Sequence, residues 1–209
     1  MLVRDIMRSP VVAISPDTTL QDAYRTMHEK GIRHLPVIEN DKLVGVITDR
    51  DLRLATSALA PVPFPPGSQV SAVMCQRPLT TDALDPVEDA ARIMWEQKIG
   101  CLPVMNDGQL IGIITNIDLL DALMRMTGVD KPSGRLEVRL ADHPGELARL
   151  TGFLSHRNVN VHSILTYPDG SDWVRTVLRI GSIEVRRLAR DMRRAEFEVL
   201  WPPEKPCPR

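Results

Sequence analysis

About the first 125 residues carry one pattern of apolar and polar positions twice. Residues 3–52 recur at 70–119 with a constant spacing of 67 and no gap. Each copy has the element order β-α-β-β-α, with helical periodicity in its helices and short apolar runs in its strands. Because two copies of one small unit suggest that neither buries its apolar face alone, we expect them to pack on each other. A cleft between paired copies is a natural place for a ligand.

Copy one starts with a β-leaning stretch over 11–14. A helix follows, which Thr18 and Gln21 open with capping-box spacing and which Gly31 ends. The remaining elements of this copy, two strands and a helix, are predicted over 35–38, 43–48 and 49–58.

Copy two repeats these elements after a proline-rich stretch over 60–67, which cannot be helical. Its first helix opens at Asp85 with a proline at the next position. Its two strands meet at Asp107-Gly108, a strong hairpin signal, and its last helix spans about 117–126.

After residue 134 the pattern changes. Six segments follow in the order βαββαβ, which describes a ferredoxin-like sandwich. Five arginines of the last helix fall on one face, opposite its apolar residues, so we interpret that face as wet rather than as a nucleic-acid surface. The strands are predicted over 136–140, 159–167, 173–180 and 197–201, and the helices over 146–156 and 183–195.

The predicted fold class is therefore α+β, with two β-α-β-β-α units packed as a pseudo-two-fold pair and a separate βαββαβ domain. The predicted parts are a first unit over 1–59, a proline-rich linker over 60–69, a second unit over 70–127, a linker over 128–134, the third domain over 135–201 and a disordered tail over 202–209.

Composition excludes several functions. A hydrophobic content of 43% and a charged content of 25% are ordinary for a globular protein, and a net charge of −1 attracts neither nucleic acid nor an anionic membrane. Apolar runs are short and the N-terminus lacks a secretory signal, so we expect a cytoplasmic protein. Cys75, Cys101 and Cys207 are interpreted as reduced thiols. Neither a metal site nor a catalytic motif is present in the sequence.

A threonine ends the last strand of each copy, and an aspartate lies in the first turn of the next helix. The pairs are Thr48 with Asp51 and Thr115 with Asp118. Free amides at a helix N-terminus suit a phosphate beside the threonine hydroxyl, and the carboxylate can accept both hydrogens of a ribose diol. On spacing alone, a purely local capping interaction is favoured over ligand binding.

The doubled unit resembles a pair of CBS domains over about residues 1–126. The resemblance is carried by the His34-Leu35-Pro36-Val37 and Cys101-Leu102-Pro103-Val104 segments and by both Gly-x-x-Thr-x-x-Asp endings. It implies a Bateman module that binds AMP, ADP, ATP or S-adenosylmethionine, with Thr48 and Asp51 holding phosphate and ribose and Thr115 and Asp118 matching them. Gly45 and Gly112 would let a planar base approach the backbone.

The two copies differ beside these pairs. Copy one carries Arg33, His34, Arg50 and Arg53, where copy two carries Gly100, Cys101, Ile117 and Leu120. Guanidinium groups are favoured partners of phosphate, so copy one is expected to hold the more highly charged ligand. A solvated helix face is an equal alternative for Arg53. The candidate nucleotide-binding residues are Val12, Arg33, His34, Thr48, Arg50, Asp51, Gly100, Cys101, Thr115 and Asp118.

Residues 135–201 resemble an ACT domain. The resemblance rests on the βαββαβ order, on the loop Asp142-His143-Pro144-Gly145-Glu146-Leu147 and on Asn158-Val159-Asn160-Val161. It implies amino-acid binding at an edge shared by two protomers, or dimerisation alone. A plain helix start with Asp142 as cap is the structural alternative. The candidate amino-acid-binding residues are Asp142, Gly145, Glu146, Leu147, Asn158 and Asn160.

A CBS pair followed directly by an ACT domain resembles the acetoin-utilization regulatory proteins (AcuB type). The resemblance implies a non-catalytic, homodimeric sensor of an adenine nucleotide that controls an unknown partner protein in acetoin or related carbon metabolism. The alternative is a structural or dimerisation adaptor without a small-molecule ligand.

Overall fold

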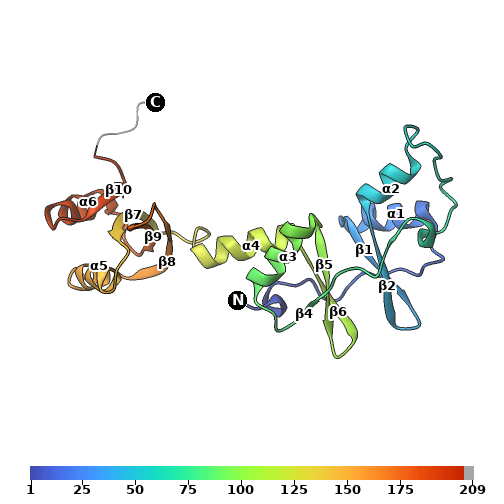
Figure 1. The fold of residues 1–209 in the computed structure, drawn as a ribbon, viewed down its shortest axis with the longest axis horizontal. Coiled ribbons are helices and arrows are strands. Elements are labelled where there is room, and N and C mark those ends of the chain that lie inside the picture. Colours follow the sequence, from blue (N-terminus) through green and yellow to red (C-terminus); the bar gives the residue numbers. More distant parts are fainter. Residues whose placement is uncertain (205–209) are drawn as a thin grey trace. The chain divides into compact units, whose positions relative to one another are not determined.

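Each copy of the repeat is built around a β-hairpin flanked by helices (Figure 1). The structure, a computed structural model, describes residues 1–204. Copy one contains α1 (Leu20–Lys30), β1 (His34–Glu39), β2 (Lys42–Thr48) and α2 (Asp49–Thr56), and copy two contains α3 (Val87–Gln97), β5 (Cys101–Asn106), β6 (Gln109–Thr115) and α4 (Asn116–Thr127). The shorter elements are η1 (Val3–Asp5), η2 (Val70–Ala72), β3 (Cys75–Gln76) and β4 (Thr81–Asp82). Two three-stranded sheets result, ordered β1-β2-β3 and β4-β5-β6.

The two hairpins close through two-residue turns. Asn40 and Asp41 have φ angles of 48° and 61°, and Asp107 and Gly108 have φ angles of 48° and 79°. Such left-handed pairs match the twist of the flanking strands, and Asn, Asp and Gly tolerate them best. The predicted hairpins are confirmed, and β1 extends one residue beyond each end of the strand predicted over 35–38.

The first residues of each copy complete the core of the other copy. Val3 and Ile6, at the start of copy one, are buried among the core residues of copy two. Val70, at the start of copy two, is buried in the core of copy one, and Met74 packs against the same cluster. These two stretches, residues 3–8 and 70–75, are the exchanged segments that interlock the two halves. Their sheets also meet in a small buried cluster of Val46, Cys101 and Ile113, which confirms that the copies pack on each other.

The prediction of a strand over 11–14 is wrong. Within this stretch only Ile14 forms a bridge, parallel to Val37 of β1. The flanking residues Pro10 and Pro16 lack the N–H group that would extend a ladder on either side.

Two helix starts also differ from their predictions. The cap of α1 is Thr19 rather than Thr18, because the Thr19 hydroxyl accepts a hydrogen bond from the Asp22 amide at 3.0 Å. Helix α3 begins at Val87, since the Asp85 carboxylate is used by the preceding turn, where it accepts from the Asp82 amide at 2.8 Å.

A second compact unit begins at Leu123, within α4. Its elements are β7 (Gly134–Ala141), α5 (Glu146–Ser155), β8 (Val161–Pro168), β9 (Trp173–Ile180), α6 (Val185–Arg194) and β10 (Glu198–Trp201). The antiparallel sheet has the order β10-β7-β9-β8, which confirms the ferredoxin-like prediction. The core lies between this sheet and the helices, where Leu136, Leu150, Leu178 and Met192 are fully buried.

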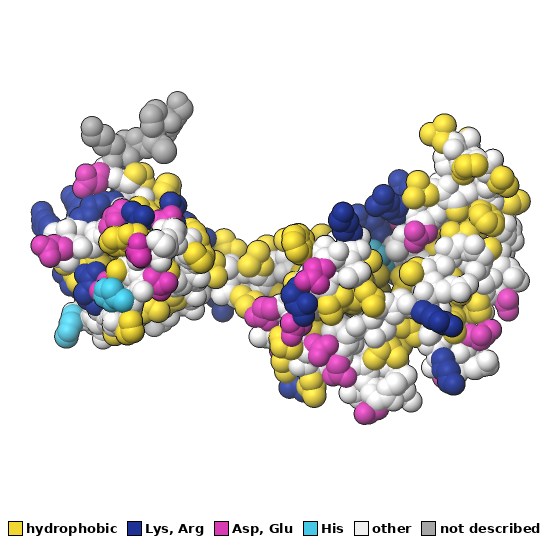
Figure 2. All heavy atoms as spheres, in the orientation of Figure 1, with side chains coloured by type: hydrophobic (Ala, Val, Ile, Leu, Met, Phe, Trp, Pro, Cys, Tyr) yellow, Lys and Arg dark blue, Asp and Glu magenta, His cyan; other side chains and the backbone are white. Residues whose placement is uncertain are grey.

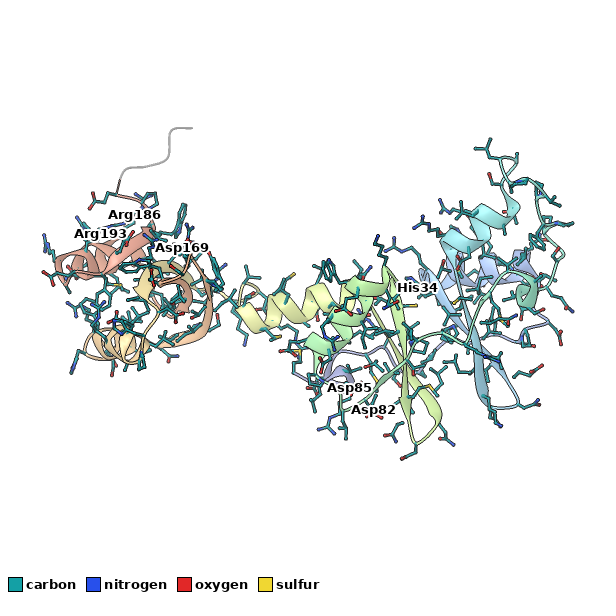
Figure 3. The ribbon with its side chains drawn as sticks, in the orientation of Figure 1. His34, Asp82, Asp85, Asp169, Arg186 and Arg193 are labelled. Atoms are coloured by element: carbon teal, nitrogen blue, oxygen red, sulfur yellow. The ribbon has the colours of Figure 1, made fainter. Side chains whose placement is uncertain are left out.

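The arginine-rich face of α6 is not uniformly wet. Arg186 is exposed, but the Arg193 side chain is only 19% exposed and donates to the Val199 carbonyl at 3.1 Å and the Pro202 carbonyl at 2.6 Å. Figure 3 labels both arginines on α6. Arg193 therefore ties α6 to the end of β10, and Pro202, the first residue of the predicted tail, is buried. The last part of that tail, 205–209, lies outside the described residues, as does Cys207.

Within residues 1–204, no helix combines the length and the apolarity that crossing a bilayer requires.

Candidate functional site

The copy-one site is the turn from β2 into α2, formed by Thr48 and Asp51. The Thr48 amide and hydroxyl donate to Asp51 Oδ2 at 2.9 and 2.7 Å, and the Asp51 amide donates to the Thr48 hydroxyl at 3.2 Å. This is a complete capping box, so the local capping interaction favoured by the spacing is present. It uses one carboxylate oxygen. Among residues 1–204 no group donates a hydrogen bond to the other oxygen, Oδ1.

The copy-two site is the equivalent turn from β6 into α4, formed by Thr115 and Asp118. The Thr115 amide and hydroxyl donate to Asp118 Oδ2 at 2.9 and 2.6 Å. Here the other oxygen is also occupied, because Arg8 Nε donates to Asp118 Oδ1 at 2.7 Å. The Asp118 side chain is only 3% exposed, whereas Asp51 is half-buried. Both aspartates thus accept hydrogen bonds from their threonine through Oδ2. They differ in the other oxygen, Oδ1, which has a donor in Asp118 and none within residues 1–204 in Asp51.

His34 and Cys101 occupy matching places, each opposite the threonine of its own site. His34 of β1 pairs with Thr48 of β2, and Cys101 of β5 pairs with Thr115 of β6. His34, labelled in Figure 3, also lies against copy two, because a Cβ on Gly100 would be 2.9 Å from its Nε2 atom. Gly100 therefore makes room for this imidazole.

Burial sets the protonation of both residues. It lowers the pKa of His34, an effect that the neighbouring Arg33 charge reinforces and the charges of Asp51 and Asp49 oppose. The imidazole is therefore neutral at neutral pH. Burial also raises the pKa of Cys101 to about 12, with the charges of Asp51 and Cys75 adding to it. Cys101 is a protonated thiol packed in the core between the copies, not a reactive thiolate.

The arginines of copy one are not equivalent. Arg53 forms an ion pair with Asp49 one turn earlier, Nε to Oδ2 at 2.9 Å, which supports the solvated helix face expected as its alternative. Arg33 and Arg50 are exposed and form no ion pair within the described part of the chain. They are the cations beside the copy-one site that remain available to an anion.

Gly45, within β2, and Gly112, within β6, do not lie open to a planar base. A Cβ on Gly45 would lie 2.5 Å from the Met74 sulfur, and a Cβ on Gly112 would lie 2.5 Å from the Met7 sulfur. In both copies a methionine of the exchanged segment fills the space beside the glycine backbone. The predicted role of these glycines toward a ligand is therefore wrong. Val12, a further candidate, is half-buried and packs against the core of copy one.

The candidate residues of the second unit lie at opposite ends of α5. Gly145, with φ 102°, caps the start of α5, and Asp142 does not act as the cap, because its side chain has no bond to the helix. Asn158 and Asn160 follow the other end, about 15 Å away along a ten-residue helix. One chain therefore does not bring the two groups together.

Within the loop group, Glu146 is paired with Arg149 at 2.7 Å, and this hydrogen bond lowers the pKa of Glu146. Asp142, Gly145 and Leu147 are exposed. In the other group, Asn158 has a left-handed φ of 54°, and the Asn160 carbonyl accepts from the Gly181 amide at 2.9 Å. Within residues 1–204, no cluster of three or more His, Cys, Asp or Glu side chains could hold a metal ion.

Arg8 is the residue that sequence reasoning missed. It lies 110 positions from Asp118, and the exchange of segments brings the two together. The repeat contains a signal for its importance, because the spacing of 67 aligns Arg8 with Cys75. At this position copy one has a charged residue and copy two an uncharged one.

Comparison with known families agrees with this architecture. The CBS domain model matches residues 3–57 and 70–125, more than half of the chain. The chain belongs to the CBS-domain family. The ACT domain model matches residues 134–191, so the second unit is an ACT domain.

Curated relatives share the CBS pair. The chain is 40% identical over 139 residues to a CBS domain-containing protein of Dictyostelium discoideum, covering 60% of this chain and 93% of that protein. It is 33% identical over 140 residues to an inosine-5'-monophosphate dehydrogenase of Korarchaeum cryptofilum, covering 66% of this chain but only 28% of that enzyme.

Solved structures give the same fold. CBSX2, determined in complex with AMP, is 32% identical with a TM-score of 0.54, over 60% of this chain and 97% of that one. A Vibrio cholerae protein assigned by its name to acetoin utilization (AcuB) is 30% identical with a TM-score of 0.54, over 64% and 98%. The CBS pair of MJ0100, in complex with 5'-methylthioadenosine and S-adenosyl-L-methionine, is 26% identical with a TM-score of 0.54, over 63% and 98%.

Proposed function

We propose that this protein is a non-catalytic regulatory sensor that binds an adenine nucleotide at the copy-one site. The observation that carries the proposal is the half-buried Asp51 carboxylate, held by Thr48 through one oxygen and without a donor to the other within residues 1–204. The hydroxyls of a ribose diol can donate to such a carboxylate. Free amides at the start of α2 provide a place for a phosphate.

Charge favours a phosphorylated ligand at this site. Arg33 and Arg50 are exposed and without ion-pair partners in the described part of the chain, so phosphate oxygens need not displace an existing carboxylate. The neutral His34 adds a hydrogen-bonding side chain without adding repulsion or attraction. The copy-two site has no arginine at the four matching positions.

The comparisons support the ligand class. CBSX2 was crystallised with AMP and the CBS pair of MJ0100 with two adenosyl compounds. We therefore propose AMP, ADP, ATP or S-adenosylmethionine as the ligand.

Titration calorimetry with these four compounds tests the proposal. The unmodified protein is expected to bind at least one of them, and Asp51→Asn, which keeps a cap but removes the charge, should weaken binding roughly tenfold or more. Asp49→Asn is the matched control, because it removes a neighbouring carboxylate that pairs with Arg53 and should leave affinity unchanged. Absence of binding heat for all four compounds would refute the sensor proposal.

The regulated process is part of the same proposal. The V. cholerae AcuB protein supports acetoin or related carbon metabolism as the process that a cytoplasmic sensor of this kind controls through a partner protein. Disruption of the gene should slow growth on acetoin and leave growth on glucose unchanged.

The ACT domain is proposed to hold two copies together and to bind an amino acid at their shared edge, since one chain separates the two candidate groups. Removal of residues 135–209 should then convert a dimer into a monomer in light scattering.

A scaffold without a ligand is the second candidate function. It is favoured by apolar side chains on α4, where Ile117 and Leu120 are each 55% exposed; Figure 2 shows hydrophobic side chains along this helix. If Ile117→Asp with Leu120→Asp abolishes self-association while the unmodified protein binds no adenosine compound, the scaffold is the function that remains.

A further inference from the structure

The two sites differ in one residue that each receives from an exchanged segment. Arg8 exchanges two backbone hydrogen bonds with Ile113 of β6, at 2.8 and 3.1 Å. Cys75 pairs in the same antiparallel manner with Val46 of β2. Val46 and Ile113 are counterparts in the repeat, so Arg8 stands toward Asp118 as Cys75 stands toward Asp51.

We infer that Arg8 closes the copy-two site to nucleotides, whereas Cys75 leaves the copy-one site open. This inference rests on the proposed function, because it takes the aspartate oxygen Oδ1 as the acceptor for a ribose diol. In copy two that oxygen already accepts from the Arg8 guanidinium at 2.7 Å. In copy one it has no donor within residues 1–204. Arg8 is therefore a residue that decides how many nucleotides one chain binds.

The charges explain why a ribose does not simply replace Arg8. A charge-assisted hydrogen bond between guanidinium and carboxylate is stronger than one from a neutral hydroxyl. The Asp118 carboxylate is only 3% exposed, so withdrawal of Arg8 would leave a buried negative charge without its cation. The Arg8 side chain itself is 71% exposed, so it covers Asp118 from the solvent side, where a ligand would have to arrive.

A thiol at the same place cannot act in this way. Cys75 is an exposed residue with a short side chain, and a thiol is a weak hydrogen-bond donor without positive charge. It neither neutralises Asp51 nor occupies its Oδ1 atom. The reciprocal substitutions Arg8→Cys and Cys75→Arg therefore exchange the proposed determinant between the two sites.

Titration calorimetry of the full chain with AMP tests the inference by counting sites. The unmodified protein is expected to bind one AMP per chain, with affinity lowered about tenfold or more in Asp51→Asn and unchanged in Asp118→Asn. Arg8→Cys should raise the count to two, and adding Asp118→Asn to that variant should return it to one. Arg4→Cys, which removes an exposed arginine from the same segment, is the control and should leave the count at one.

Cys75→Arg gives an independent measurement at an exposed position, in case Arg8→Cys does not fold. It should weaken AMP binding to copy one at least about tenfold, and the additional substitution Asp51→Asn should then have little further effect. Two AMP per chain in the unmodified protein, one in a folded Arg8→Cys variant, or unchanged affinity in Cys75→Arg would overturn the inference while the proposed function stands. A protein that binds AMP only after Arg8→Cys would refute the proposed copy-one site but uphold the closing role of Arg8. No binding of AMP, ADP, ATP or S-adenosylmethionine by any variant refutes both.

Discussion

Copy one and copy two build the same turn from a closing strand into a helix, with the same threonine and aspartate, yet they leave the aspartate in different states. Asp118 is buried and has both oxygens engaged, whereas Asp51 is half-buried with one oxygen engaged. The difference does not arise within either turn. It comes from Arg8 at the copy-two site and from Cys75 at the copy-one site. Each of these residues lies on the segment that the other copy contributes. Duplicated halves can therefore keep their local chemistry and still diverge through a single residue brought in by the fold.

The largest expected loss of stability follows from substitutions in the exchanged segments themselves. Val3 and Val70 are both fully buried, Val3 in the core of copy two and Val70 in the core of copy one. Replacing either with Ala should cost about 2 kcal/mol of unfolding free energy, because the cavity is only partly refilled. Urea denaturation measures the loss.

Hydrogen exchange locates that loss. Val3→Ala should speed amide exchange in β5 and β6 of copy two, and Val70→Ala in β1 and β2 of copy one. The opposite assignment would contradict the interlocked arrangement.

The next largest loss of stability is expected at Arg8 and not at its counterpart Cys75. Arg8→Ala removes the cation from a buried carboxylate, while the exposed arginine and the entry of water moderate the cost, so we expect a loss of about 1–2 kcal/mol. Cys75→Ala removes an exposed thiol and should change stability by less than about 0.5 kcal/mol. Thermal unfolding of both variants checks this contrast. Equal losses would show that the ion pair adds nothing to copy two.

A smaller effect, similar in both copies, is expected from the threonines of the two sites. Thr48→Ala and Thr115→Ala should each cost about 1 kcal/mol, since the first removes the cap of α2 and the second removes the hydroxyl that donates to the buried Asp118 carboxylate. The corresponding serine variants keep the hydroxyl and should recover most of the loss. A loss confined to one copy would mean that the second turn is held by something other than its threonine.

The smallest expected effect is on the pH dependence of stability, which has opposite signs for His34 of copy one and Cys101 of copy two. The folded-state pKa of His34 lies below 6.5, so folding favours the neutral imidazole, and stability should fall as the pH drops below about 6.5. His34→Gln should flatten this fall in urea titrations at pH 7.0 and 5.5.

Cys101 has the opposite sign. Its pKa is about 12 in the folded state against 9.0 for the free group, so stability should decline as the pH rises above 9. Cys101→Ala should remove that decline between pH 9 and 10.5. An unchanged alkaline slope in the variant would place its cause outside this thiol.

The sequence by itself determined the repeat, most of the strands and helices, the ACT-type βαββαβ order and the threonine–aspartate pairs of the two sites. These features depend on residues close together in the chain or on periodic apolar positions, and such patterns remain visible without a structure. Three features of the repeat were predicted incorrectly: the strand over 11–14 and the starts of α1 and α3. Each depends on which of several adjacent polar or proline residues ends a strand or caps a helix.

Only the tertiary structure decided which segment completes which half. It placed Met7 and Met74 over the glycines expected to face a ligand, and it set Arg8 against Asp118 across 110 positions of sequence. It also placed the two candidate groups of the ACT domain at opposite ends of α5. Periodicity and spacing carry no information about such pairs, because a hydrogen bond depends on atoms meeting in space, and folding can bring any two parts of the chain together.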